Sequence, residues 1–374
     1  MGLSSLLAIH PGGATKESSP PVIDIASLLD GSEGEARATT VAEVGAACRK
    51  WGFFSVVNHG LPDETMTAFD EAMRAFFALP LDEKRQIKRT ATNSRGFADD
   101  ELTKQIRDQK QLFDCGHVPR PDLVADAPEN HVMDGYNQWP SGALPGFEPA
   151  TREYYNACAE VAAALMGAIA ESLGLRRDYF ESSLGVAHTS YLRLNYYPAK
   201  GCSDPAAVVQ DADSGGTPFG PLGVSRHTDA GAVTLLLQDH VAALEVYSGS
   251  KQDVGDGEWV PVDPVQGALT VNIGDMVEVW TNGLYAAPEH RVRASTNQER
   301  FSAPFFYNPS YAADVAPIRE ITKEGYARIR AEAGNGGGGC SVAASGMAPR
   351  FRPINWGQFR RRRFEGDFAD QGTE

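Results

Sequence analysis

The amino-acid sequence predicts a mixed α/β fold whose core is mainly β. Apolar residues recur at spacings of three and four between Pro62 and Pro80 and again over residues 151–173, which indicates two amphipathic helices. From Thr189 onward the spacing changes to two, the period of a strand whose two faces differ. The 374 residues could hold two average domains, but we favour one compact unit.

The first elements predict an α/β prelude. A short strand at Val22–Asp24 precedes a helix over residues 37–50, which leads into the apolar strand Phe53–Val57. Pro62 favours the start of the next helix, and Pro80 ends it.

The middle of the chain is charged or polar before a long helix. Residues 82–89 predict an exposed helix, and residues 93–108 are polar enough to form a loop or lid. The helix over residues 151–173 places apolar side chains near one face, with Gly174 as its C-cap, and we expect it to back the β core.

These patterns divide the chain into five segments. We expect a flexible lead over residues 1–19, an N-terminal α/β region over 20–150, a β core with its backing helix over 151–330, a Gly-rich flexible insertion over 331–348, and a C-terminal helix within 349–374.

The strand after Thr189 has one polar face. Tyr191, Arg193, Asn195 and Tyr197 alternate with apolar residues, so they share a face. The pattern alone leaves open whether this face lines a cavity or meets solvent. The following loop, residues 199–225, is long for a strand connection and could cover a site.

A second group of residues predicts a metal centre. His227 and Asp229 are two residues apart, so on a strand both can point at one ion, and His290 follows later in the chain. Two imidazoles and one carboxylate on an octahedral metal leave three positions open, as in non-heme Fe(II) oxygenases. A β framework around them is predicted by the strand Val233–Gln238, a turn at Asn272–Asp275 and a hairpin signal at Asn282–Gly283.

Arg300 and Ser302 repeat the spacing of two. A guanidinium beside a hydroxyl suits a carboxylate that must be held in one orientation, here that of a small organic acid. Each motif has an ordinary alternative, because His-x-Asp is common in exposed strands and turns and Arg-x-Ser is more often a surface pair. Their combination favours the iron site.

The order of motifs resembles a known family. The isopenicillin N synthase-like branch of the 2-oxoglutarate/Fe(II) dioxygenases is similar from about residue 20 to residue 370, on these segments: Pro20–Asp24, Trp51–Gly60, Leu194–Pro198, His227–Asp229, Asn272–Asp275, His290–Val292 and Arg300–Ser302. The resemblance implies a double-stranded β-helix, or jelly roll, wrapped by helices, with iron at its mouth.

The resemblance also implies roles. His227, Asp229 and His290 would ligate Fe(II), while Arg300 and Ser302 would bind the far carboxylate of 2-oxoglutarate. The expected cosubstrates are 2-oxoglutarate and O2, with ascorbate as a reductant, and the expected reaction is hydroxylation, desaturation or ring closure of a small-molecule metabolite. Further contacts are expected from Tyr197 and Asn195 to 2-oxoglutarate and from Arg193 and Phe306 to the substrate.

Composition narrows the partners. The 34 basic and 49 acidic residues give a net charge of −15, which disfavours nucleic acid. No apolar run is long enough for a membrane span. Five cysteines without paired spacing fit reduced thiols of a cytoplasmic protein. The basic run at residues 360–363 is best explained as a solvated helix face, and the oligomeric state stays open.

Three alternatives remain at this point. Relatives such as isopenicillin N synthase keep a similar iron triad without using 2-oxoglutarate. A catalytically silent binding module could keep the barrel, and a zinc hydrolase could use the same ligands, although no His-Glu-x-x-His helix is present. Among the other histidines, His59 is expected to be structural and His188 is left open.

Overall fold

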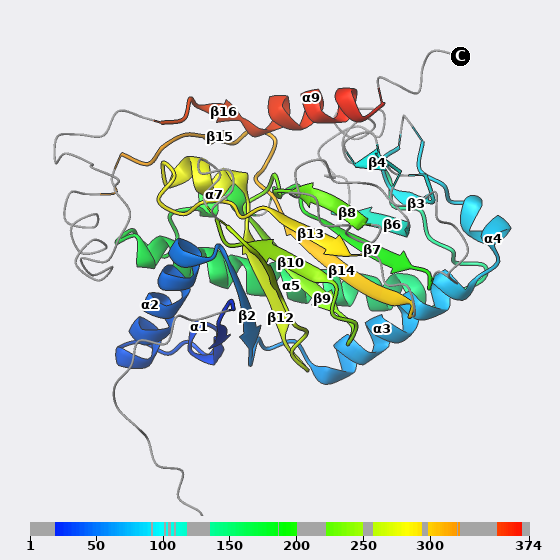
Figure 1. The fold of residues 1–374 in the computed structure, drawn as a ribbon, viewed down its shortest axis with the longest axis horizontal. Helices are drawn as coiled ribbons and strands as arrows, with labels where there is room; N and C mark the ends of the chain where they lie inside the picture. Colours follow the sequence, from blue (N-terminus) through cyan, green and yellow to red (C-terminus); the bar gives the residue numbers. More distant parts are fainter. Residues whose placement is uncertain are drawn as a thin grey trace, which may run out of the picture.

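The computed structural model contains helices and strands over most of the chain (Figure 1). The structure describes residues 19–90, 93–100, 102–103, 106–107, 110–117, 135–185, 187–199, 222–249, 257–293, 298–319, 321 and 350–368. The expected lead, the Gly-rich insertion and almost all of the loop at 199–225 lie outside these residues.

Two sheets form the core. The major sheet has eight strands in the order β1-β2-β12-β9-β14-β7-β6-β3. Only the β1/β2 pair is parallel among its pairings. Its strands are β1 (Val22–Asp24), β2 (Phe53–Val57), β3 (Gly96–Ala98), β6 (Gln111–Gly116), β7 (Tyr191–Tyr197), β9 (Val233–Gln238), β12 (Leu269–Ile273) and β14 (Arg300–Tyr307).

The minor sheet has four antiparallel strands in the order β11-β10-β13-β8. A small apolar cluster that includes Phe53, Tyr197, Val246 and Val292 joins side chains of both sheets. The two sheets therefore face each other. The strands of the minor sheet are β8 (Leu222–His227), β10 (Leu244–Tyr247), β11 (Trp259–Pro261) and β13 (His290–Arg293).

Helices cover the outer face of the major sheet, where the larger apolar core lies. These are α2 (Glu35–Lys50), α3 (Asp63–Ala78) and α5 (Phe147–Ser172), with α5 running behind the strands in Figure 1. Phe69 of α3 stacks on Tyr154 of α5 with ring centroids 4.0 Å apart. Gly174 has φ +77°, which suits a residue that ends a helix. The expected mixed α/β fold with a mainly β core is confirmed.

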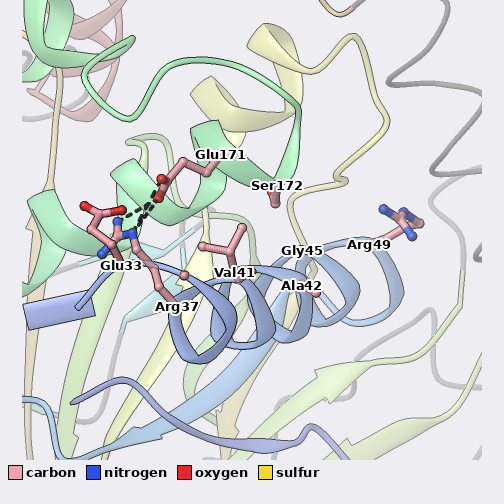
Figure 2. A pocket seen from close by; sticks show the side chains of 10 residues that line it. Glu33, Arg37, Val41, Ala42, Gly45, Arg49, Glu171 and Ser172 are labelled. Carbon is pink, nitrogen blue, oxygen red and sulfur yellow. Dashed lines mark hydrogen bonds and ion pairs between the residues drawn. The ribbon is translucent and has the colours of Figure 1, made fainter. Parts of the chain in front are cut away.

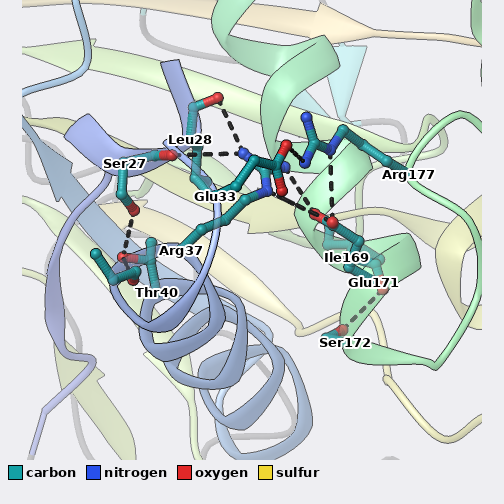
Figure 3. A network of polar contacts seen from close by, with 10 residues as sticks. Ser27, Leu28, Glu33, Arg37, Thr40, Ile169, Glu171, Ser172 and Arg177 are labelled. Carbon is teal, nitrogen blue, oxygen red and sulfur yellow. Dashed lines mark hydrogen bonds and ion pairs between the residues drawn. The ribbon is translucent and has the colours of Figure 1, made fainter. Parts of the chain in front are cut away.

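A polar network fastens α2 to α5 on this outer layer. Arg37 is 4% exposed, and its Nη2 donates to Glu171 Oε2 at 2.7 Å (Figure 3). Its Nη1 donates to the carbonyl oxygens of Ser27 and Leu28. A 340 Å³ cavity lies beside this pair, and Figure 2 shows Gly45 and Ser172 on its wall. None of the candidate site residues lines it.

Three local predictions are wrong. Asn282–Gly283 does not close a hairpin: both residues have positive φ, and they follow helix α7 (Asp275–Trp280), where the Gly283 N–H bonds the Glu278 carbonyl. The stretch 93–108 contains β3 and the two-stranded pair β4 (Leu102–Thr103) and β5 (Ile106–Arg107).

The third concerns residues 82–89. The helix there, α4 (Leu81–Arg85), is shorter than expected, and Lys84 is buried on it with its ammonium bonded to the Phe77 carbonyl. Two further short helices are α1 (Ala26–Leu29) and α6 (Glu181–Leu184).

The C-terminal helix α9 (Trp356–Phe368) confirms the prediction for that part of the chain. It follows the short pair β15 (Asp314–Val315) and β16 (Ile354–Asn355), and Trp356 at its start is fully buried. Among the described helices, none combines the length and apolar character needed to cross a bilayer.

Candidate metal centre and acid pocket

Three potential metal ligands meet between the two sheets. His227 Nε2 and His290 Nε2 each lie 3.7 Å from Asp229 Oδ1, and one ligand atom of each residue lies within 4.8 Å of the others. The 3.7 Å separations are shorter than two metal bonds of ~2.1 Å, so one ion can touch Asp229 and either histidine. The His227 side chain is 27% exposed, against 6% for Asp229 and 8% for His290. The centre therefore opens to solvent on the His227 side.

Strand pairing brings the histidines together. His227 ends β8 and pairs directly with His290, which begins β13. Asp229 lies two residues beyond the end of β8, so alternation along a strand does not orient it. The two side chains point to one place, but the loop after the strand, rather than the strand, aims the carboxylate.

Backbone carbonyls fix the ring tautomers. His227 Nδ1 lies 2.8 Å from the Ser225 oxygen, and His290 Nδ1 lies 3.2 Å from the Pro288 oxygen. Since a carbonyl only accepts, each Nδ1 carries the proton and each Nε2 keeps a lone pair for a metal. Burial, followed by the neighbouring His290, lowers the pKa of His227 to about 4, so the ring is neutral at pH 7.

Two strands of the major sheet hold the carboxylate. Thr234 Oγ1 donates to Asp229 Oδ2 at 2.6 Å, and Asn272 Nδ2 donates to the same oxygen at 2.8 Å. Oδ1 is left to face the histidines. Burial would raise the pKa of Asp229, but His290, His227 and these two hydrogen bonds hold that pKa below its ordinary value.

The segment from Asn272 to Asp275 packs closely against the backbone of residues 229–231. The Asp275 N–H donates to the Asp229 carbonyl at 2.8 Å. A Cβ at Gly274 would overlap the Gly231 carbonyl, so only glycine allows this approach. Asn272 and Ile273 end β12 and Gly274 caps α7, so the expected turn is a change from strand to helix.

Arg300 lies in a buried pocket with neutral partners. It is 1% exposed, and its nitrogens donate to Ser302 Oγ and Gln238 Oε1 at 3.2 Å and to the Val241 carbonyl at 3.3 Å. Its guanidinium lies over the Tyr197 ring at 5.2 Å. Within the part of the chain that the structure describes, no carboxylate pairs with it, although a buried cation calls for an anion.

The register of β7 completes this pocket. Arg300 pairs with Tyr197, and Ser302 pairs with Asn195, so the four predicted residues lie together. The Asn195 Oδ1 atom is buried and accepts no hydrogen bond from the described residues. A Cβ at Gly223 would press on the Tyr197 ring at 2.9 Å, so glycine lets that ring lie against β8.

Arg193 and Phe306, the two predicted substrate contacts, lie on the same face of the major sheet as Arg300 and Asn195, further along β7 and β14. Arg193 makes a paired contact with Asp114 of β6, with Nε–Oδ1 and Nη2–Oδ2 distances of 2.8 Å. A carboxylate of the protein is thus its partner. Phe306 stacks on Tyr191 at 4.6 Å.

Sequence reasoning missed the residues that support the site. The sequence predicts Thr234 and Gln238 only as strand residues and Asn272 only as part of a turn. In the structure the polar side chains of Thr234 and Asn272 bond Asp229, and that of Gln238 bonds Arg300. Lys110 is 8% exposed, and its charge contributes to the lowered pKa of His227. No local pattern around Lys110 singled it out.

The remaining histidines lie elsewhere. His59 has the structural role expected: its Nε2 lies 3.1 Å from the Gly267 carbonyl, and its Nδ1 accepts from the Leu61 N–H. His188 lies outside the metal centre, with its ring 5.3 Å from those of His117 and Tyr307. Burial, followed by the charge of His117, lowers the pKa of His188 to about 4.

This neutral His188 should make the fold acid-sensitive. Below pH 6.5 His188 becomes protonated in the unfolded chain, but in the folded chain it stays neutral down to about pH 4. The free energy of unfolding therefore falls as the pH drops from 6.5 to about 4. One pKa unit corresponds to ~1.4 kcal/mol, and partial exposure of the ring reduces the effect to about 1–2 kcal/mol between pH 7 and pH 5. Urea unfolding of wild type and His188→Phe at both pH values measures it. The exposed His240→Gln is the control, and an unchanged pH dependence in His188→Phe would contradict the expectation.

Comparison with known proteins agrees with this geometry. Residues 188–309 match the 2OG-Fe(II) oxygenase superfamily, and residues 20–142 match the N-terminal region described for a non-haem dioxygenase in morphine synthesis. A homoarginine-6-hydroxylase of Glycine max is 33% identical over 82% of this chain and 90% of its own length. Jasmonate-induced oxygenase 1 of Arabidopsis thaliana is 28% identical over 91% of this chain and 71% of its own length.

Solved structures give the same result. JOX2, crystallised with 2OG, Fe and JA, is 28% identical with a TM-score of 0.62 and covers 86% of this chain and 84% of its own. A full-length Neurospora crassa protein, crystallised with alpha-KG and 5-formyluracil, is 22% identical and has a TM-score of 0.70 over 96% of this chain and 100% of its own, which shows the shared double-stranded β-helix fold. The chain therefore belongs to the 2-oxoglutarate/Fe(II) oxygenase superfamily, in the isopenicillin N synthase-like branch, and is an enzyme that depends on 2-oxoglutarate and Fe(II).

Proposed function

We propose that His227, Asp229 and His290 hold the ferrous ion and that Arg300 and Ser302 bind the far carboxylate of 2-oxoglutarate. The donor set fits iron, because two neutral imidazoles and one carboxylate converge on one point with their lone pairs free. An ion held there would couple the loss of carbon dioxide from 2-oxoglutarate to the oxidation of a C–H bond by dioxygen.

The observation that carries this proposal is the buried Arg300 guanidinium, which lies on the same face of the major sheet as Thr234, the residue that bonds Asp229. The guanidinium is oriented by Ser302, Gln238 and the Tyr197 ring, so its fork is fixed before the acid arrives. A guanidinium and a hydroxyl on one strand fit a terminal carboxylate, and the Asn195 amide lies on the neighbouring strand. Lys110 adds positive charge near the same ligands.

The protein's part in the reaction is positioning and exclusion of water. Thr234 and Asn272 keep Asp229 Oδ1 toward the metal, and the backbone carbonyls keep both Nε2 atoms unprotonated. The apolar cluster with Phe53 and Tyr197 closes the space between the sheets. The substrate is a small molecule that is hydroxylated, desaturated or cyclised. Phe306 and Arg193 are the residues proposed to contact it.

Anaerobic titration with Fe(II) and 2-oxoglutarate tests the assignment. We expect a weak visible charge-transfer band in the wild type that needs both additions, followed by succinate release when air, substrate and ascorbate are supplied. Iron binding without any effect of 2-oxoglutarate would instead favour an oxidase that does not use it. Absence of iron binding would favour the silent binding module.

A further inference from the structure

One row of paired residues crosses the major sheet from the metal centre to a cluster of arginines. Asn272 and Thr234, which hold Asp229, pair with each other, and Thr234 pairs with Phe306. Phe306 pairs with Tyr191, and Tyr191 pairs with Gly116 on β6. Directly paired residues share a face of the sheet, and neighbouring strands are ~4.8 Å apart. The stacked Phe306 and Tyr191 rings therefore lie on the same face of the sheet as the residues that hold Asp229, and Phe306 is on the strand next to Thr234.

Three guanidinium groups surround the Tyr191 ring. Those of Arg95, Arg193 and Arg360 lie 5.3, 6.0 and 5.9 Å from its centroid. They come from the segment before β3, from β7 and from α9, so the fold gathers them from distant parts of the chain. A Cβ at Gly116 would overlap the Arg95 guanidinium, so that group occupies the end of the row.

Arg360 differs from its neighbours on α9. Arg361 and Arg362 are exposed, as expected for a solvated basic run, but Arg360 is half-buried. Its guanidinium lies 5.9 Å from both the Tyr191 and Trp356 rings, and among the described residues it meets these rings and no carboxylate. Among the described side chains of this basic run, Arg360 therefore departs from the expected solvated face. Arg193, in contrast, is already held by Asp114.

We propose that the substrate of this enzyme is a small organic acid whose carboxylate binds Arg360, with Arg95 and Arg193 beside it. Its apolar part lies over Tyr191 and Phe306, which extend toward the metal. The inference rests on the proposed function, because it places the reacting carbon at the triad. A guanidinium held between rings is preoriented for a carboxylate.

The row also sets the length of the substrate. Tyr191 and Gly116 are two and three strand spacings from Thr234, which is roughly 10–14 Å. The carbon that is oxidised is therefore several bonds away from the carboxylate. A neutral ring compound would fill the aromatic surface but leave Arg360 without an anion.

Equilibrium binding to the full chain loaded anaerobically with Fe(II) and 2-oxoglutarate tests this proposal. The probes are phenylacetate, 3-phenylpropanoate and 4-phenylbutanoate, each compared by calorimetry with its own primary amide. We expect at least one acid to bind roughly tenfold more tightly than its amide in the wild type. In Arg360→Gln that preference should fall about tenfold, with the amide affinity unchanged.

Arg361→Gln is the matched control, because it removes the same charge from the exposed side of the same helix. Arg360→Lys should keep part of the preference, which separates loss of the ligand contact from a disturbed helix, and thermal unfolding checks that each variant folds. Equal affinity for acid and amide in the wild type, a preference that survives Arg360→Gln, or failure of every acid to bind would overturn the proposal. The charge-transfer band forms without these probes, so its absence would count against the proposed function instead.

Discussion

Replacing Asp229 by asparagine should lower the affinity for Fe(II) by at least ~100-fold and reduce succinate release to background. The substitution keeps the size of the side chain but removes the negative charge of the one carboxylate in the proposed triad. Removing even a residue that only orients a ligand costs about 10–100-fold in metal affinity, so loss of the ligand charge should cost more. Anaerobic Fe(II) titration gives the affinity, and a succinate assay gives the turnover.

Thr234→Val provides a graded companion to this experiment. It keeps the carboxylate but removes the 2.6 Å hydrogen bond to Oδ2, so we expect about a tenfold loss of Fe(II) affinity. Asp263→Asn changes the charge of the chain at an exposed position and should behave as the wild type. Iron binding by Asp229→Asn at wild-type affinity would show that this carboxylate is not a ligand.

Elements with local signals could be predicted from the sequence. Pro62 and Pro80 bound α3, and Gly174 follows α5 with the positive φ that glycine adopts without strain. The alternation from Tyr191 to Tyr197 gave the correct faces of β7, because a period of two is a property of the strand itself.

The failures have a physical cause as well. Asn282–Gly283 adopts the positive φ values that its residue types favour, but a type I′ hairpin turn and a helix end both use such values. Residues 275–280, shortly before it, include two valines and one tryptophan, which favour strands, yet they form α7. Tertiary contacts of this buried segment outweigh its local preference.

The support of the site could not be predicted because it depends on register between distant strands. Asn272 reaches Asp229 across 43 positions of sequence, and Arg360 reaches Tyr191 from the other end of the chain. Neither contact follows from spacing along one element. The motif residues can be proposed from the sequence because each carries its chemistry in its own side chain, whereas these partners act only through their place in the fold.

Arg300→Ala should raise the dissociation constant for 2-oxoglutarate by ~100-fold while leaving Fe(II) binding intact. Arg300 is 1% exposed and none of its described hydrogen-bond acceptors is charged, so a bound carboxylate would be its anionic partner. Truncating one member of a buried charge pair costs about 2–5 kcal/mol, which is roughly 30-fold or more in affinity. The dissociation constant of Arg300→Lys should lie between those of the wild type and Arg300→Ala, since lysine keeps the charge but lacks the planar guanidinium that can donate two parallel hydrogen bonds.

A comparison of two acids isolates the contact from any general damage to the pocket. The wild type should bind 2-oxoglutarate far more tightly than 2-oxopentanoate, which has the same chelating end but lacks the far carboxylate. In Arg300→Ala this difference should nearly vanish, with the affinity for 2-oxopentanoate little changed, because the substitution and the missing carboxylate remove the same interaction. If 2-oxoglutarate keeps its full advantage over 2-oxopentanoate in Arg300→Ala, the far carboxylate binds elsewhere, and Lys110 near the same ligands becomes the next residue to substitute.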